Sequence, residues 1–319
     1  MDPNFSENQD AWPHFEKACG NPGQSPVNIN FLQTSFKSFG PIAFLGYNVP
    51  FRFKVENGGH ALYITPEHPH LESYGGPLPA RYTLSKGVFR FGNETSQRGS
   101  EHTLDGRYFD AELQLLMSCE KPTPTDCLRR DKGLAIFVIL FQKKEASNPF
   151  LDILINATEH MTTRGNTTET LIPMAFLLPN STSNYYLYLG SLTFPPCTGK
   201  ALVVVFDNVV SIGEMQARYY SPAFSVSISP WAKAGGDSEV FNNCNFNMQL
   251  KKLRNNLYYY FGTCKNRVAG NLRKLQNLGN RIVYRSFKFT SAAATSAATL
   301  KLVLSVATTV HYVGSGRAM

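Results

Sequence analysis

Residues 82–118 read YTLSKGVFRFGNETSQRGSEHTLDGRYFDAELQLLMS and predict two strands joined by a polar loop. In the first strand Val88 and Arg90 alternate with phenylalanine and glycine, and in the second Glu112 and Gln114 alternate with leucine. Because successive side chains on a strand point to opposite faces, each strand has one apolar face and one mixed face. Any chemistry in this stretch is therefore expected on the mixed faces.

The same stretch resembles the central strands of the α-class carbonic anhydrases. The family form QFHFHWG, followed by SEHTxxxxxxxAELHLVH, corresponds here to KGVFRFG and SEHTLDGRYFDAELQLLMS. In that family three His on these strands bind a catalytic Zn²⁺ and leave one position open for water. The corresponding positions here are Val88, Arg90 and Gln114, and none of them carries an imidazole. We therefore expect no zinc cofactor.

The resemblance implies an α+β, β-dominated α-carbonic anhydrase fold, with a large central, twisted, mostly antiparallel sheet and short peripheral helices. We expect one such domain over residues 12–290, after an arm of residues 1–11 and before a tail of residues 291–319. A stretch at about residues 218–265 is longer than the family needs and is interpreted as an insertion. The 43% hydrophobic content allows a core in which disulfides only add stability.

Three further patterns predict local structure outside the central stretch. The apolar runs LAIFVILFQ (residues 134–142) and ALVVVF (residues 201–206) are typical of strands buried on both faces. Residues 51–67 alternate and contain Asn57-Gly-Gly, which predicts a hairpin turn. The capping-box spacing of residues 211–214, SIGE, predicts the start of a helix.

Several positions keep residues that matter in active relatives. The resemblance places Glu101 at the position that orients the active-site Thr in relatives, and Glu112 at the position that orients a ligand His. It places Thr193 at the position of that Thr, which donates a hydrogen bond to Glu101. His60 matches the proton-shuttling His, and without a zinc-bound water we interpret it as a relic or a cavity-lining group. Phe194 replaces a smaller residue and is expected to narrow the pocket.

Two carboxylates left behind by a lost metal would need compensation. An isolated buried charge costs several kcal/mol. We therefore expect the guanidinium of Arg90 to lie in the former metal region and to pair with Glu112, Gln114 or Glu101.

Six cysteines and no CxxC metal pattern favour disulfides over metal binding, with reduced thiols as the alternative. One pair matches the disulfide of secreted and membrane-bound carbonic anhydrases, a second brackets a short proline-containing loop, and a third brackets a predicted helix. These pairs are, in that order, Cys19 with Cys197, Cys119 with Cys127, and Cys244 with Cys264.

N-linked glycosylation triplets agree with an oxidising compartment. No signal peptide is visible, so we interpret the sequence as a mature or internally starting form of a secreted or cell-surface protein, with an intracellular protein as the alternative. The acceptor candidates are Asn4, Asn93, Asn156, Asn166 and Asn180.

Charge is unevenly distributed along the chain. The last 80 residues carry twelve basic and no acidic side chains, whereas the first 239 carry 19 basic and 23 acidic ones. This asymmetry favours an acidic or polyanionic partner, with a solvated basic face as the alternative. Nucleic acid is not expected, because no nucleic-acid-binding module is recognisable. The partner-binding candidates, in a predicted basic helix, are Lys251, Lys252, Arg254 and Tyr258.

The end of the chain and the choice of function leave alternatives open. The weak apolar run of residues 300–313 allows a lipid-anchor signal, but a final strand or a tail fits it better. The favoured function is a non-catalytic extracellular module for binding, adhesion or structural assembly. The alternative is a divergent enzyme with metal-independent, hydrolase-like chemistry, for which the cleft residues would be His60, Glu101, Glu112 and Thr193.

Overall fold

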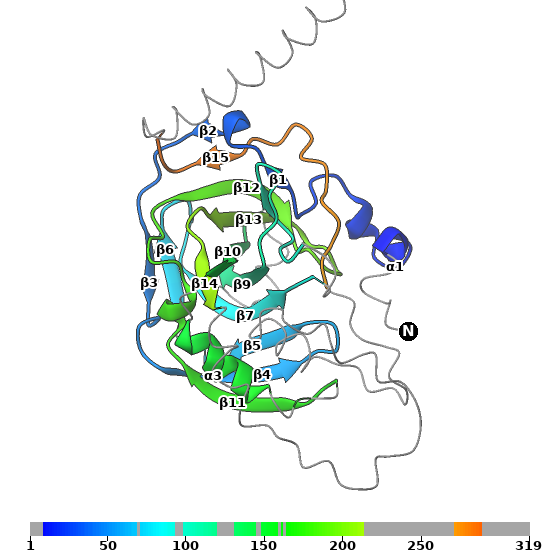
Figure 1. Cartoon of the computed structure of the whole chain (residues 1–319). Coiled ribbons are helices and arrows are strands. Elements are labelled where there is room, and N and C mark those ends of the chain that lie inside the picture. The colour runs from blue at the N-terminus through cyan, green and yellow to red at the C-terminus, as the bar shows by residue number, and fades with distance from the viewer. Residues whose placement is uncertain are drawn as a thin grey trace, which may run out of the picture. The chain divides into compact units, whose positions relative to one another are not determined.

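The computed structural model describes residues 9–68, 71–92, 98–119, 131–144, 148–158, 161, 164–213 and 271–288. The chain divides into a unit of residues 1–286 and a second unit of residues 287–319, of which only the first two residues are described. Within the first unit one large mixed sheet dominates, and its helices are short (Figure 1). The predicted β-dominated fold class is confirmed.

Thirteen strands form the large sheet, in the order β11-β4-β5-β7-β9-β10-β13-β12-β15-β2, with β14 paired to β10 and with β3 and β6 attached beside β7. Most neighbours are antiparallel; the pairs β10–β13, β10–β14 and β15–β2 are parallel. The strands are β2 (Ser35–Phe36), β3 (Ile42–Leu45), β4 (Phe51–Asn57), β5 (Leu62–Pro66), β6 (Glu72–Gly75), β7 (Tyr82–Arg90), β9 (Ala111–Cys119), β10 (Leu134–Lys144), β11 (Thr167–Ile172), β12 (Tyr185–Ser191), β13 (Gly199–Phe206), β14 (Val210–Gly213) and β15 (Tyr284–Arg285).

The remaining elements lie around this sheet. A separate parallel pair joins β1 (Asn28–Ile29) to β8 (Thr103–Leu104). Helix α3 packs near β11 (Figure 1). The helices are η1 (Gln9–Ala11), α1 (Trp12–Phe15), η2 (Lys17–Gly20), η3 (Phe31–Gln33), α3 (Pro149–Ala157) and η4 (Met174–Leu177).

The predicted hairpin and the two predicted buried strands are present as β4–β5, β10 and β13. The predicted helix start at residues 211–214 is wrong, because Ser211 and Ile212 belong to strand β14. They pair in parallel with Gln142 and Lys143 of β10. Pairing with a long neighbouring strand therefore overrides the local capping pattern, and residue 214 lies outside the described residues.

The faces of β7 and β9 separate as their alternation predicts. Phe89 and Leu113 belong to the main hydrophobic core together with side chains of β4, β5, β10 and β13. Val88 lies opposite Gln114 in the antiparallel register, and Arg90 lies opposite Glu112. Because these four residues have the other parity, they share the face away from that core.

The last described segment closes the sheet at its far edge. Residues 271–288 include β15, which pairs with β12 on one side and with β2 on the other (Figure 1). The backbone N–H of Lys274 donates to Gln9 Oε1 at 2.8 Å, so this segment also holds the N-terminal helices. Two segments far apart in the sequence therefore complete the domain together.

Candidate functional site

The three positions that correspond to zinc ligands lie together and are buried. Val88 and Arg90 are two residues apart on β7, and Gln114 lies directly across from Val88 on β9. Their exposed fractions are 0%, 1% and 0%. The strand register therefore places them side by side on one face, as three ligands of one ion would have to be.

The side-chain amide of Gln114 joins both retained glutamates. Its Nε2 donates to Glu101 Oε2 at 2.6 Å and to Glu112 Oε1 at 2.8 Å. Its Oε1 accepts from the hydroxyl of Thr193 at 3.1 Å. Thr193 therefore donates to the amide that replaces a His, and a side-chain hydrogen bond with Thr193 also acts to lower the pKa of Glu101, the partner that the resemblance assigns to it.

The guanidinium of Arg90 lies beside the same cluster. Its Nε is 3.6 Å from Glu101 Oε2, so the expected pairing with a retained glutamate is present. Its two Nη atoms donate to Thr193 Oγ1 at 3.4 Å and to the carbonyl oxygen of Asn271 at 3.3 Å. The cation also lies 4.9 Å from the ring centroid of Phe194, within the range of a cation–π contact.

The two carboxylates have different surroundings. Glu112 Oε2 accepts from the backbone N–H groups of Glu101 and His102, and Oε1 lies 2.9 Å from His102 Nδ1. Burial favours its neutral form, but these contacts and that of Gln114 outweigh burial and lower the pKa of Glu112. Burial raises the pKa of Glu101 despite the nearby Arg90. Glu112 is therefore the more firmly ionised of the pair.

A second layer of polar residues supports the cluster, and its members were not among the predicted site residues. His102 Nε2 is 2.7 Å from the hydroxyl of Tyr188, which is 2.7 Å from Ser25 Oγ. The backbone N–H of Arg273 donates to Glu101 Oε1 at 2.8 Å, and its guanidinium donates to the carbonyl oxygen of Ser25. The SEHT motif could have pointed to His102, whereas Arg273 comes from beyond the predicted insertion.

Comparison with known proteins identifies the family of this arrangement. A family model described as eukaryotic-type carbonic anhydrase matches residues 7–227, more than half of the chain. The chain belongs to the carbonic anhydrase family. The resemblance stated from the motifs is thereby confirmed.

Curated relatives agree with the family model. This chain is 27% identical to carbonic anhydrase 12 from Homo sapiens, over 94% of this chain and 77% of that protein. It is 30% identical to carbonic anhydrase 15 from Mus musculus, over 64% of this chain and 67% of that protein. It is also 31% identical to receptor-type tyrosine-protein phosphatase zeta from Rattus norvegicus, over 70% of this chain but only 10% of that much longer protein.

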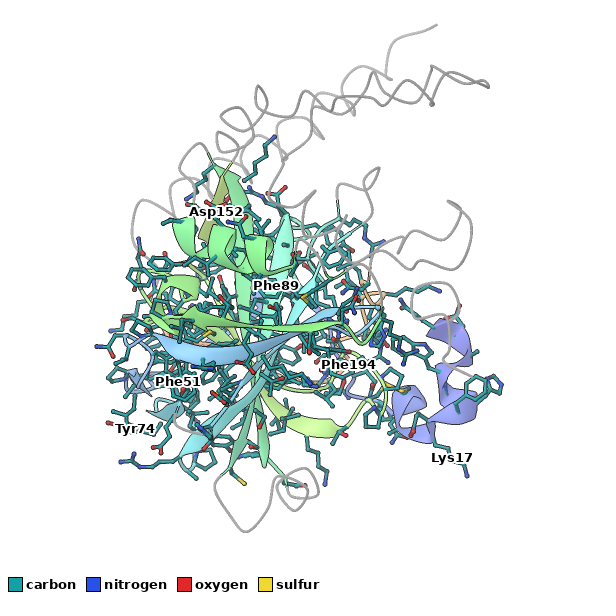
Figure 2. All side chains as sticks on the ribbon, turned by 90° about the horizontal axis from the view of Figure 1, so that it is seen from below. Lys17, Phe51, Tyr74, Phe89, Asp152 and Phe194 are labelled. Atoms are coloured by element: carbon teal, nitrogen blue, oxygen red, sulfur yellow. A yellow bond between two sulfur atoms is a disulfide. The ribbon has the colours of Figure 1, made fainter. Side chains whose placement is uncertain are left out.

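Two other predicted residues lie near Arg90 and are only partly buried. His60 is half-buried, and its Nε2 is 2.7 Å from the hydroxyl of Tyr63. Phe194 is half-buried and lies beside Arg90. In Figure 2 it lies toward the N-terminal helices, one of which carries Lys17. Phe194 thus contacts Arg90 through its ring face, and the narrowing of the pocket stays a prediction.

The surroundings of His60 give a prediction on pH. Burial, with Arg90 and Lys86 nearby, lowers the pKa of His60 from 6.5 to about 4. An unfolded chain takes up the proton first as the pH falls, so His60 reduces the stability of the fold between about pH 6.5 and pH 4. We expect this decline to be shallower in His60→Gln, measured by urea unfolding across that range. A His60 ring that titrates near its ordinary pKa by NMR would contradict the assignment.

The predicted covalent features are described only in part. Cys19 and Cys197 form the disulfide that the resemblance implies, and Cys119 is also in a disulfide. Asn156 and Asn180 are exposed, and Asn166 is half-buried. The other predicted residues lie outside the described ranges: Asn4, Asn93, Cys127, Cys244, Cys264, Lys251, Lys252, Arg254 and Tyr258.

Metal-binding clusters and membrane-spanning helices are both absent from the described ranges. Within them, no three His, Cys, Asp or Glu side chains gather in a way that could hold a metal ion. None of the helices there is both long enough and apolar enough to cross a bilayer.

Proposed function

We propose that this chain is a non-catalytic carbonic anhydrase homologue that acts as an extracellular binding, adhesion or assembly module. The observation that carries the proposal is the engagement of Gln114. Its amide nitrogen donates to both Glu101 and Glu112, at 2.6 and 2.8 Å, where the family resemblance expects a metal-binding imidazole. Hydrogen bonds from Gln114 and an ion pair from Arg90 thus stabilise the two carboxylates, in place of a metal ion.

The chemistry of the three positions does not fit Zn²⁺. Zinc needs lone pairs from imidazole, thiolate or carboxylate groups. Val88 has no donor atom, Arg90 is a permanent cation, and the nitrogen of Gln114 offers protons and not a lone pair. The proposal therefore includes no zinc-bound water and no hydration of CO₂.

Metal-independent hydrolysis in the same cleft has less support. A general acid or base must reach substrate. Glu101, Glu112 and Thr193 are all buried, with exposed fractions of at most 1%, and all three are hydrogen-bonded to protein groups. The geometry thus favours a structural role for the residues that the enzymatic alternative would need.

An extracellular location is part of the proposal. It is supported by the Cys19–Cys197 disulfide, since disulfides persist in oxidising compartments, and by the similarity to a receptor-type protein. In this proposal the carbonic anhydrase fold serves to present a binding surface and does not serve chemistry in the cleft. An acidic or polyanionic partner is proposed from the excess of basic residues in the last 80 residues.

Zinc content is the direct test. We expect the purified full chain to hold no stoichiometric zinc after incubation with Zn²⁺ and to show no CO₂ hydration above background. The triple variant Val88→His, Arg90→His, Gln114→His restores the family ligand set and is expected to bind zinc in a one-to-one ratio. The matched control, Val88→His with Gln114→His, keeps the Arg90 cation and is expected not to bind. Tight zinc with hydration activity in the unaltered chain would overturn the proposal.

A further inference from the structure

A groove outside the site lies between the start of α3, helix η4 and strand β14. Its volume is about 410 Å³, which is in the range of small-ligand sites. Asn148, Ser211 and Lys144 contribute polar groups to its wall, and Phe150 and Phe176 contribute aromatic rings. A wall of this mixed kind suits a ligand that is itself part apolar and part polar.

The aromatic part of the groove is held in place by neighbouring contacts. The rings of Phe150 and Phe176 stack with centroids 3.7 Å apart and planes 14° apart. Asn148 fixes both: its Oδ1 accepts from the N–H of Phe150 at 3.1 Å, and its Nδ2 donates to the carbonyl oxygen of Phe176 at 2.8 Å. Phe176 nevertheless stays 50% exposed. The stack thus presents an aromatic face to the groove without a large loss of side-chain freedom on binding.

One N-glycosylation triplet lies on this groove. Asn180 lines it, is exposed, and begins the sequence Asn180-Ser181-Thr182. The loop is tied down, because Asn208 Nδ2 donates to the carbonyl oxygen of Ser181 at 3.2 Å. Two other triplets begin in the described ranges, at Asn156 and Asn166, and neither asparagine lines the groove.

We propose that Asn180 carries an N-linked glycan whose first N-acetylglucosamine residues lie in this groove against the face of Phe176. A pyranose ring has an apolar face of C–H groups and a rim of hydroxyl and acetamido groups. The aromatic stack suits the first, and Asn148, Ser211 and Lys144 suit the second. The inference rests on the proposed extracellular location, because attachment occurs in the secretory pathway.

The covalent step uses a lipid-linked oligosaccharide pyrophosphate as donor. Asn180 Nδ2 forms a bond to the anomeric carbon of the first sugar, and the bond from that carbon to the pyrophosphate oxygen breaks. The pyrophosphate leaves with the electron pair, and the proton lost from Nδ2 passes to the transferase and then to solvent. No oxidant or reductant is needed.

The test measures both attachment and docking. The full chain, secreted from eukaryotic cells behind a cleavable leader, is analysed by glycopeptide mass spectrometry, and glycan release from the folded protein by peptide N-glycanase is timed. We expect Asn180 to be occupied, and Phe176→Ala to accelerate release from it about fivefold, the factor set by losing one aromatic contact. Phe176→Tyr keeps the ring and is expected to release slowly. Leu171→Ala, an equally exposed position on β11 away from the groove, is the matched control.

The outcomes separate this inference from the proposed function. An unmodified Asn180 in the secreted protein, or equal release rates for the native chain and Phe176→Ala, would overturn the docked glycan while leaving the zinc experiment untouched. Free thiols at Cys19 and Cys197 in native material would instead overturn the extracellular location.

Discussion

Replacing Arg90 with methionine is expected to lower the free energy of unfolding by about 3–5 kcal/mol at neutral pH, the usual cost of removing one partner of a buried ion pair. Arg90 and Glu101 are each about 1% exposed, with Arg90 Nε 3.6 Å from Glu101 Oε2. The substitution leaves two buried carboxylates, Glu101 and Glu112, that share the amide of Gln114. Methionine fills much of the same volume, so the loss reports charge rather than packing. Urea unfolding measures it.

The pH dependence of this loss separates an electrostatic cause from a cavity. Without the guanidinium the pKa of Glu101, already raised by burial, rises further, and the protonated acid needs no cation. The deficit of Arg90→Met relative to the native chain is therefore expected to shrink as the pH falls, and to shrink also when Glu101→Gln is added. A deficit that is constant with pH would mean that lost packing is the cause.

An exposed arginine provides the matched control. Arg52 lies near Glu67 and Glu169 at 3.4 and 3.0 Å, but its side chain is 56% exposed. Arg52→Met is expected to cost less than about 1 kcal/mol, because solvent screens such pairs. Similar losses at Arg52 and Arg90 would contradict the role given to the buried cluster.

Removal of the Cys19–Cys197 disulfide is expected to cost about 5 kcal/mol, since the bond closes a loop of 178 residues in the unfolded chain. The serine variant Cys19→Ser with Cys197→Ser gains the conformational freedom of that loop on unfolding. Trp12 packs against both cysteines and is buried, so its fluorescence should report release of the N-terminal helices. The loss in the free energy of unfolding is measured by thermal and urea unfolding of the double variant and of each single variant.

The single variants serve as the control for packing. Each already loses the bond, so the double and single variants should lose nearly the same stability. A loss below about 1 kcal/mol in all three would show that the bond does not constrain the chain in solution.

Much of the fold follows from short-range periodicity. Alternation in residues 82–118 correctly assigns Phe89 to the core and Arg90 to the opposite face, and long apolar runs correctly predict β10 and β13. The capping pattern at residues 211–214 fails because it is a local signal, whereas the strand there is created by β10. Periodicity reports burial, and pairing between distant segments can overrule any signal of four residues.

The site residues that lie in the central family motifs could be predicted from the sequence. The contact made by a segment far along the chain could not. Glu101, Glu112, Thr193 and Arg90 all lie in one cluster, as the motifs and the cost of buried charge led us to expect. Arg273 was not among the predicted site residues, although its backbone N–H reaches Glu101. Such a contact is set by how the sheet closes, which depends on long-range packing and not on the residues next to Arg273.

The closing segment, residues 271–288, has a consequence for synthesis. A ribosome makes the chain from its N-terminus, so β7 and β9 emerge with Glu101 and Glu112 long before Arg273 and strand β15. Until then Glu101 lacks one hydrogen-bond donor, and β12 and β2 lack the strand between them. Unpaired strand edges invite aggregation. The nascent protein is therefore expected to pass through a period with an open sheet edge, in which it is more prone to aggregate than the completed domain.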